Sequence, residues 1–482
     1  MDRIASILKY QWRVYWRQFS RPGALRATNQ GLLLILTLYV FIRYLAIIHS
    51  AVLGVARGKT GSLEGALTIV SIGWLFTPLV NTKAGITMNG LLHLPIPRMQ
   101  LFSIKLLSLL VPPYGWMVAA GSLIVCYPLS QGPKPIIGTM GGLLFTGSCC
   151  LTGVTIAQLM SVSSWRKLLG FLLAIFAILS ALQVTISHVH LDLLLTFSPV
   201  AIAAQTALGN GSWRGIGLLA GLTAVAYFAA LWSFQQSLES SSNRHSRKIV
   251  VLNPFIFLGR IGAFLTKDLR YFRRLLDPYF GLLASALCSW YLSSAQVPSI
   301  EVLTRFIVII FAPNASLVFN CFGLDNRSAL DRYSLLPLSG KTIIAGKNLA
   351  YVLIMSVEIL PVVILGAWRL GFWAASLCLA EAALLALAYM TWGNWIAIKH
   401  AFKMQFFRVA SGGSVIHAIA GLAFGSLPGV FLISLSKAGE TLNWMLITLV
   451  FLFYGALYLN SVQRGGMDFD LRPDSFREFI NS

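Results

Sequence analysis

The chain contains little charge for its length. Of its 482 residues, 11% are Asp, Glu, Lys or Arg, whereas 57% are hydrophobic and the mean hydropathy is +0.75. A soluble globular protein carries about 25% charged residues. This shortage of charge excludes an ordinary soluble domain and predicts an integral membrane protein.

The sequence also lacks the patterns that several metal and enzyme sites require. Its six cysteines form no Cys-x-x-Cys pair, so neither disulfides nor a thiolate metal site is expected. No His-Glu-x-x-His or Gly-x-Ser-x-Gly motif occurs, which removes the residues of an intramembrane metalloprotease or serine hydrolase. His188, His190 and Asp192 have no further ligand in the pattern, so we interpret them as a solvated loop and predict no metal site.

A complete phosphate-binding loop is missing as well. The run Ser339-Gly340-Lys341-Thr342 resembles the end of such a loop, but the first glycine would have to stand at position 335, which is leucine. The run from Gly54 to Thr60 is one residue too short, and neither run follows a soluble strand. We therefore expect no ATP hydrolysis by this chain itself and predict no catalytic residue in it.

Apolar runs are what the sequence has in abundance. A membrane span needs about 20 mostly apolar residues, and we find twelve candidates. They lie near 31–50, 65–82, 106–128, 136–161, 168–187, 215–235, 279–295, 303–323, 348–367, 371–397, 412–435 and 443–461.

The spans fall into two groups of six. Residues 1–239 form the first half, 240–256 a polar linker, 257–463 the second half and 464–482 a cytoplasmic tail. Each half begins with an amphipathic basic helix, from Ile4 to Arg17 and from Phe264 to Arg274, whose aromatic and basic side chains suit the lipid headgroup layer. The predicted fold is an all-α integral membrane protein of about twelve transmembrane helices, arranged as two homologous six-helix halves, each with an N-terminal elbow helix.

Lysine and arginine are distributed unevenly between alternate loops. If the N-terminus is cytoplasmic, the inner segments hold 29 of the 37 basic residues and the outer segments hold 7, while Arg43 lies within the first span. Basic residues favour the cytoplasmic side. Both termini are therefore predicted to be cytoplasmic, and the net charge of +21 reflects topology and contact with anionic lipids rather than nucleic-acid binding.

One short motif occurs twice, 242 residues apart, each time between two predicted spans. The first copy is Leu94-Pro95-Ile96-Pro97, followed by Arg98 and Lys105. The second copy is Leu336-Pro337-Leu338-Ser339, followed by Lys341 and Lys347. A repeated polar element in an apolar chain indicates one surface contact element in each half.

The residues of this motif predict its local structure. Pro95 and Pro337 end the preceding helix, and Pro97 or Ser339 is favoured at the start of the next one. We expect a short helix lying flat at the cytoplasmic surface in each half, with Lys105 and Lys347 where the next span begins. The apolar side chains expected to face the membrane are Leu101, Phe102, Ile104, Ile343 and Ile344. The alternative is a tight turn with an interfacial anchor.

Three charged residues lie well inside predicted spans: Arg43, Glu358 and Glu381. A charge in lipid costs about 2.5–3.5 kcal/mol on insertion scales, so each must find water or a partner. They form either a proton relay or polar substrate contact, or an interhelical ion pair or hydrogen bond.

Small residues at spacing four occur in three spans, and they allow close packing of helices in lipid. The longest such run is Gly421, Gly425 and Gly429, and shorter ones are Gly217-x-x-x-Gly221 and Gly138-x-x-x-Gly142. We interpret all three as structural.

The succession of basic elbow helix, two spans, repeated loop and four further spans resembles the membrane subunits of type-2 ATP-binding-cassette exporters. The most specific segments are Leu92 to Pro97 with Lys105, and Leu335 to Ser339 with Lys347. Asn320 to Arg327 and Phe197 to Ala201 also look like this family. The resemblance covers nearly the whole chain, except that residues 436–443 offer no counterpart to 188–214, a region that in the family dips back into the membrane from outside.

The resemblance implies two coupling helices that dock on a separate ATPase subunit, present in two copies and carrying the ATP and Mg. The residues expected to contact this partner are Leu94, Pro95, Pro97, Arg98, Lys105, Leu336, Pro337, Ser339, Lys341 and Lys347. The chain would then be the permease of an exporter in a prokaryotic plasma membrane, with no cofactor of its own, and a lipid or amphipathic substrate would suit an apolar path between the halves. A further dimer of chains stays open.

Two other functions remain open from the sequence. One is a proton-coupled secondary transporter that uses Glu358 or Glu381. The other is a lipid-interacting membrane protein that transports nothing.

Overall fold

Helices account for almost all of the chain that the computed structural model describes. It describes residues 6–10, 12–13, 42, 46, 60–80, 96–110, 113–130, 134–162, 165, 168, 172, 175, 199–207, 213–242, 255–294, 299–323, 325, 333, 338–399, 415–435 and 440–471. About 93% of these residues are helical, and none of them lies in a strand. The prediction of an all-α protein is therefore confirmed for this part of the chain.

Six helices in the described part are long and apolar enough to cross a membrane. They cover Pro135–Met160, Trp213–Leu238, Ile300–Phe319, Gly340–Leu370, Phe372–Ile396 and Trp444–Leu471. Four further predicted spans fall on helices of lesser length or hydropathy, and those at 31–50 and 168–187 lie almost wholly outside the described residues. A membrane protein is thus supported, whereas the number of twelve spans stays a prediction.

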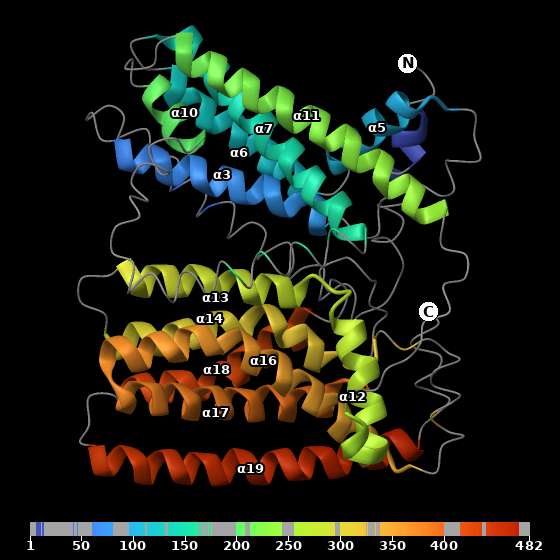
Figure 1. Cartoon of the computed structure of the whole chain (residues 1–482), viewed down its shortest axis with the longest axis vertical. Coiled ribbons are helices and arrows are strands. Elements are labelled where there is room, and N and C mark those ends of the chain that lie inside the picture. The colour runs from blue at the N-terminus through green and yellow to red at the C-terminus, as the bar shows by residue number, and fades with distance from the viewer. Residues whose placement is uncertain are drawn as a thin grey trace. The chain divides into compact units, whose positions relative to one another are not determined.

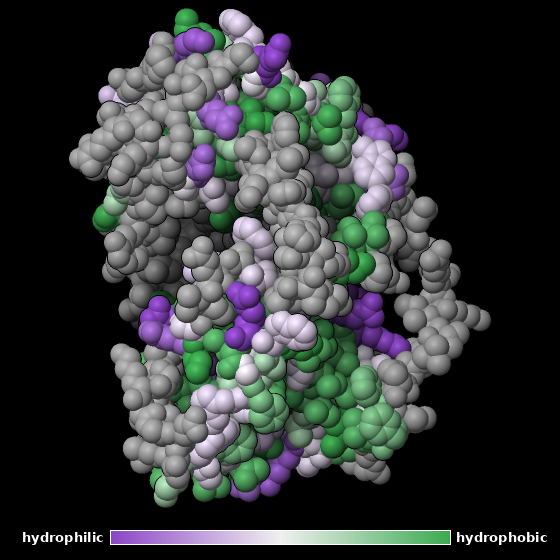
Figure 2. All heavy atoms as spheres, turned by 60° about the vertical axis from the view of Figure 1, so that its left-hand side comes forward, coloured by the Kyte–Doolittle hydropathy of each residue, from purple (hydrophilic) through white to green (hydrophobic). Residues whose placement is uncertain are grey.

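The surface of these helices is typical of a membrane protein. On α16 (Gly340–Leu370), the apolar residues Val357, Leu360, Ile364 and Trp368 are all more than half exposed, while the charged Glu358 is only 1% exposed. Figure 2 shows broad areas of hydrophobic side chains on the described surface. Soluble monomers rarely expose large apolar patches, so this arrangement supports an integral membrane protein.

The chain divides into two compact units. Unit 1 is Met1–Arg166 with His188–Lys248, and unit 2 is Lys167–Ser187 with Ile249–Ser482. Unit 1 contains α3 (Thr60–Val80), α5 (Arg98–Leu107), the short η1 (Ser108–Leu110), α6 (Pro113–Ser130), α7 (Pro135–Ser161), α10 (Pro199–Ala207) and α11 (Trp213–Ser242). Unit 2 contains η2 (Ile256–Leu258), α12 (Gly259–Phe272), α13 (Asp277–Ser294), α14 (Ile300–Phe319), α16, α17 (Phe372–Ile396), α18 (Val415–Leu435) and α19 (Glu440–Leu471).

In unit 1, α7 packs against all the other long helices. Leu67 and Trp74 of α3 are buried with Phe145 of α7. The Trp74 indole N–H donates a 2.7 Å hydrogen bond to Ser122 Oγ and thereby joins α3 to α6. The short α10 is buried between α3, α7 and α11.

In unit 2, the long helices lie side by side and α12 runs across one end of them (Figure 1). The turn between α16 and α17 is a single residue, Gly371, whose φ of 89° favours glycine. The elbow helix expected at 264–274 overlaps α12, which ends at Phe272, and its role as an elbow helix stays a prediction.

The internal repeat extends to whole helices. Adding 242 to the bounds of α3 gives 302–322, against Ile300–Phe319 for α14, and adding 242 to Arg98 gives 340, where α16 begins. Adding 242 to the bounds of α7 gives 377–403, a range that overlaps α17. Within each unit the corresponding helices also contact one another. The match ends before the last helix, as expected from the insertion at 188–214.

Two helix boundaries differ from the expected ones. The second copy of the motif is not a short helix followed by a new span, because α16 runs without a break from Gly340 to Leu370. The predicted soluble tail begins inside α19, which continues to Leu471. The extension is stabilised because Gly466 lets α19 approach α16: a Cβ atom there would lie 2.5 Å from Lys341 Cγ.

The glycine run of α18 packs as predicted. A Cβ atom on Gly421, Gly425 or Gly429 would lie 3.0 Å or less from atoms of α14 or α17. By contrast, Gly217 and Gly221 have no atom within 4 Å, so this shorter run makes no close contact in unit 1.

Gly425→Leu is expected to destabilise unit 2 by about 1–3 kcal/mol, the usual cost of overpacking. A Cβ atom at this position would lie 2.7 Å from the Tyr389 ring, which cannot move because it stacks between Phe311 and Phe319. The temperature at which detergent-purified protein loses its monodisperse elution peak measures the effect. Gly217→Leu is the matched control and should leave that temperature unchanged; equal losses in both variants would contradict the packing argument.

Candidate functional site

The first copy of the repeated motif forms a separate short helix, α5. Pro97, Arg98 and Met99 are exposed at its start, while Leu101 and Phe102 are buried. Phe102 packs against the rings of Tyr227 and Phe234 of α11. α5 ends at Leu107, where η1 follows it, and α6 begins at Pro113, so this copy is a separate short helix, as predicted. Lys105 is partly buried within α5.

The second copy is the start of α16. Ser339 and Lys341 are exposed, and the Gly340 N–H donates to the Asp470 carboxylate of α19 at 3.0 Å. A carboxylate at a helix N-terminus is favourable. The glycine that resembled part of a phosphate-binding loop therefore donates to an acidic side chain of the same chain.

The apolar side chains of both copies point into protein, and the expectation that they face the membrane is wrong. Leu101, Phe102 and Ile104 pack with Val154 of α7 and residues of α11. Ile343 and Ile344 pack with Phe264 of α12, Phe322 and Tyr333. Helix burial inside a unit outweighs the interfacial position that the sequence pattern suggested.

These two apolar clusters also join chain segments that the charge distribution placed on one side. In unit 2, the cluster contains residues after α14, before and at the start of α16, after α17 and at the end of α19. All of these segments lie in predicted cytoplasmic loops or at the adjoining ends of predicted spans. The structure therefore brings them to one end of the unit.

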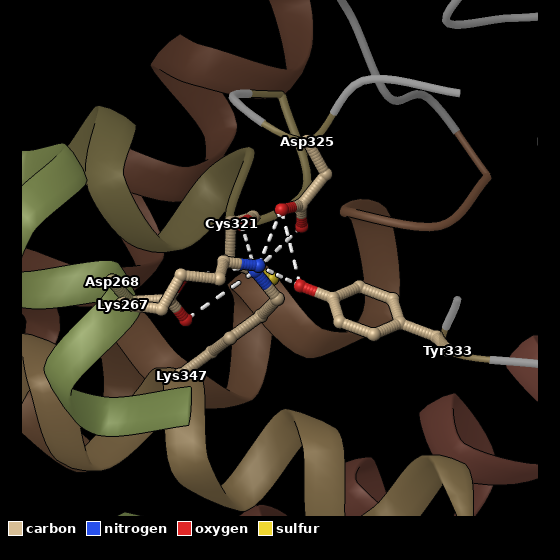
Figure 3. A network of polar contacts seen from close by, with 6 residues as sticks. All are labelled: Lys267, Asp268, Cys321, Asp325, Tyr333 and Lys347. Carbon is tan, nitrogen blue, oxygen red and sulfur yellow. Dashed lines mark hydrogen bonds and ion pairs between the residues drawn. The ribbon is translucent and has the colours of Figure 1, made fainter. Parts of the chain in front are cut away.

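A buried network of charges lies at this end of unit 2 (Figure 3). Lys347 of α16 is 2% exposed, and its amine contacts the Cys321 carbonyl at 2.8 Å and Asp325 Oδ2 at 2.9 Å. Lys267 of α12 contacts Asp325 Oδ1 at 2.6 Å. Asp268 adds a longer ion pair to Lys347, at 3.4 Å. Two lysines and two aspartates from three parts of the chain thus balance one another.

Aromatic side chains complete the network. The Tyr333 hydroxyl donates to Asp325 at 3.1 Å and contacts the amine of Lys267. The Lys347 amine lies 4.7 Å from the centre of the Phe322 ring, and the Lys267 amine lies 4.6 Å from that of Tyr333. Such cation–π contacts favour the charged amines in a buried place.

The two aspartates respond differently to burial. Burial raises the pKa of Asp325, but Lys347 and Lys267 together offset this effect, so its pKa lies below the ordinary value. Asp268 makes longer contacts, and burial raises its pKa above the ordinary value in spite of the lysines. Burial also lowers the pKa of Lys267. Asp325 is therefore the carboxylate that the network holds ionised most firmly.

Lys347 was predicted to contact an ATPase partner, and in the structure its amine is buried inside unit 2. Of the predicted partner-binding residues, Pro97, Arg98, Ser339 and Lys341 are exposed. Leu94, Pro95, Leu336 and Pro337 lie outside the described residues, as does Arg43. The role of Asp268 and Asp325 was missed, although Asp325 lies in the segment 320–327 that resembled the exporter family.

The two glutamates expected within spans are both buried. Glu358 Oε2 accepts a 2.5 Å hydrogen bond from Asn314 Nδ2 of α14, whereas Oε1 has no partner among the described residues. Glu381 of α17 is fully buried, and neither of its oxygens has such a partner. Neither residue forms an ion pair in the described part of the chain. Of the two structural alternatives, only a hydrogen bond is present, and only for Glu358.

No cluster of three or more His, Cys, Asp or Glu residues suited to a metal ion is found among the described residues, which do not include 188–192. Comparisons with family models, curated proteins and solved structures found no match to the chain.

Proposed function

We propose that this protein is the membrane subunit of an ATP-driven exporter of the type-2 ATP-binding-cassette class, and that a separate ATPase energises it. The observation that carries the proposal is the repeat: α5 and α16 begin at the same position, 242 residues apart, after the same Leu-Pro motif. Exposed residues lie at both starts, Pro97 and Arg98 at α5 and Ser339 and Lys341 at α16. Two equivalent contact elements suit a partner that acts as a pair.

Each contact element is joined to the rest of its unit in a different way. In unit 1, a displacement of Arg98 by the partner would be transmitted to α7 and α11 through the packing of Leu101 and Phe102. In unit 2, a push on Lys341 would act directly on the 31-residue α16, which the charged network holds to α12. Movement at the exposed residues would therefore shift whole spans, and the two units would respond unequally.

Co-purification from the native membrane tests the proposal. The tagged wild-type chain is expected to bring down a soluble ATPase, and Arg98→Glu with Lys341→Glu should lose it, because both residues are exposed at the proposed contacts. These positions are better chosen than Lys347, whose replacement would disturb the interior of unit 2.

Lys134→Glu is the matched control, since Lys134 is also exposed but lies in a segment predicted to be outside. It should retain the ATPase. A wild-type chain that recovers no ATPase, or a double variant that recovers as much as wild type, would contradict the proposed coupling contacts.

The buried glutamates favour a second candidate, a proton-coupled secondary transporter. Glu358 and Glu381 are acids without a counter-charge, which suits proton uptake. This candidate requires transport by the purified chain alone, driven by a pH gradient and lost in Glu358→Gln or Glu381→Gln.

A further inference from the structure

The buried face of α13 carries polar or small residues at every fourth position. Asp277, Gly281, Ser285 and Ser289 are all buried where α13 packs against α14 and α16. Residues four apart lie on one face of a helix. This face is therefore a polar line inside an otherwise apolar group of helices.

Glu358 of α16 occupies the space that Gly281 leaves on this line. A Cβ atom added to Gly281 would lie 1.9 Å from Glu358 Oε2 and 2.3 Å from Asn314 Nδ2. The Asn314 amide holds the same oxygen from α14. Three helices thus enclose one carboxyl group, and the glycine is what makes room for it.

Several buried polar atoms along this line have no hydrogen-bond partner among the described residues. They are Glu358 Oε1, Asn314 Oδ1, Ser285 Oγ and Ser289 Oγ. Buried hydroxyls elsewhere in the protein, such as Ser233 and Ser461, donate to carbonyls of their own helix. Buried polar atoms are nearly always satisfied, so a group of unsatisfied ones indicates a proton, water or ion that completes them.

The charges around Glu358 decide whether a proton, a water molecule or an ion completes these polar atoms. The charged group that acts on it from α13 is Asp277, another acid, and α14 contributes the neutral Asn314. Tyr351, also on α16, is a further titratable group that interacts with Glu358, and it supplies no positive charge. α12, α17 and α19 also pack against α16, and no described lysine, arginine or histidine forms an ion pair with Glu358. An ionised carboxylate without a positive partner is costly in these buried surroundings. The Asn314 amide N–H points at Oε2 and would repel a metal cation there.

We propose that Glu358, held by Asn314 beside the polar face of α13, is a proton-binding site within unit 2. The proton resides on Oε1, while Oε2 accepts the hydrogen bond from Asn314. The hydroxyls of Ser285 and Ser289 extend the site along α13 and give protons access to it. The site does not depend on the proposed ATPase partner, because it consists only of residues of this chain.

Carbodiimide labelling of the purified wild-type protein tests the site directly. Dicyclohexylcarbodiimide reacts with protonated carboxyl groups in apolar surroundings, and mass spectrometry identifies the modified peptide. At neutral pH we expect an adduct on Glu358 and none on Asp325, which is as buried but paired with two lysines. An unmodified Glu358 would overturn the proposal, and this measurement does not require any variant to fold.

Infrared spectroscopy supplies the second measurement. Glu358→Gln should lose a carbonyl band of a protonated carboxylic acid, whereas Glu301→Gln should lose none, because Glu301 is a surface residue paired with Arg305. The Ser285→Ala/Ser289→Ala double variant should keep the band. In heavy water, however, the band should shift more slowly than in wild type, because exchange of the Glu358 proton for deuterium is slower. A band unchanged by Glu358→Gln would overturn the site, and an unchanged exchange rate would overturn the access path.

Discussion

Lys347→Met is expected to destabilise unit 2 by about 3–5 kcal/mol, the usual cost of removing one partner of a buried ion pair. The variant leaves Asp268 and Asp325 buried with only Lys267 to balance them. It also removes the hydrogen bond to the Cys321 carbonyl. The melting temperature of detergent-purified protein, followed by elution of the monodisperse peak, measures the loss.

Two further variants separate the charge effect from a general effect of substitution on α16. Lys341→Met lies on the same helix but is exposed, so it should leave the melting temperature nearly unchanged. Lys347→Met with Asp268→Asn leaves the neutral pair of Lys267 and Asp325, and should recover much of the stability. A double variant that is less stable than Lys347→Met alone would contradict this account.

The sequence predicted the fold class well because membrane helices depend on a simple property. Apolar runs of sufficient length define them, and the helices at 135–161, 300–319 and 372–396 lie within a few residues of their predicted spans. The repeat also predicted that α5 and α16 begin in the same register. Both signals are local or periodic, so neither requires knowledge of the packing.

What the sequence did not reveal depends on contacts between distant residues. Lys347 was expected at the boundary of a span, where lysine is common. It is buried instead, because it forms ion pairs with Asp325 and Asp268. Those partners lie 22 and 79 positions away, and no spacing rule connects them. Similarly, the position of Glu358 within a span was predicted, whereas its partner Asn314 and the space at Gly281 depend on how three helices meet.

Asp325→Asn is expected to cost unit 2 about 3–5 kcal/mol near neutral pH. The carboxylate accepts from Lys267 at 2.6 Å, from Lys347 at 2.9 Å and from Tyr333 at 3.1 Å. Asparagine keeps one acceptor oxygen but removes the negative charge, so the buried Lys347 and the partly buried Lys267 share Asp268 alone. Denaturation of the purified protein, compared with the control Glu301→Gln at a surface ion pair, measures the difference.

The pH dependence of this difference distinguishes a charge effect from lost packing. Because the two lysines hold the pKa of Asp325 below its ordinary value, the unfolded chain takes up the proton first as the pH falls. The stability that Asp325 contributes is therefore complete above about pH 4, the pKa of an unperturbed aspartate, and is lost as the pH falls towards the folded pKa. Asp268, whose pKa is raised, affects the pH dependence of stability with the opposite sign. It is present in both the wild type and the variant. The gap between wild type and Asp325→Asn should thus narrow below about pH 4. A gap that stays constant with pH would mean that Asp325 stabilises unit 2 by its shape and hydrogen bonds rather than by its charge.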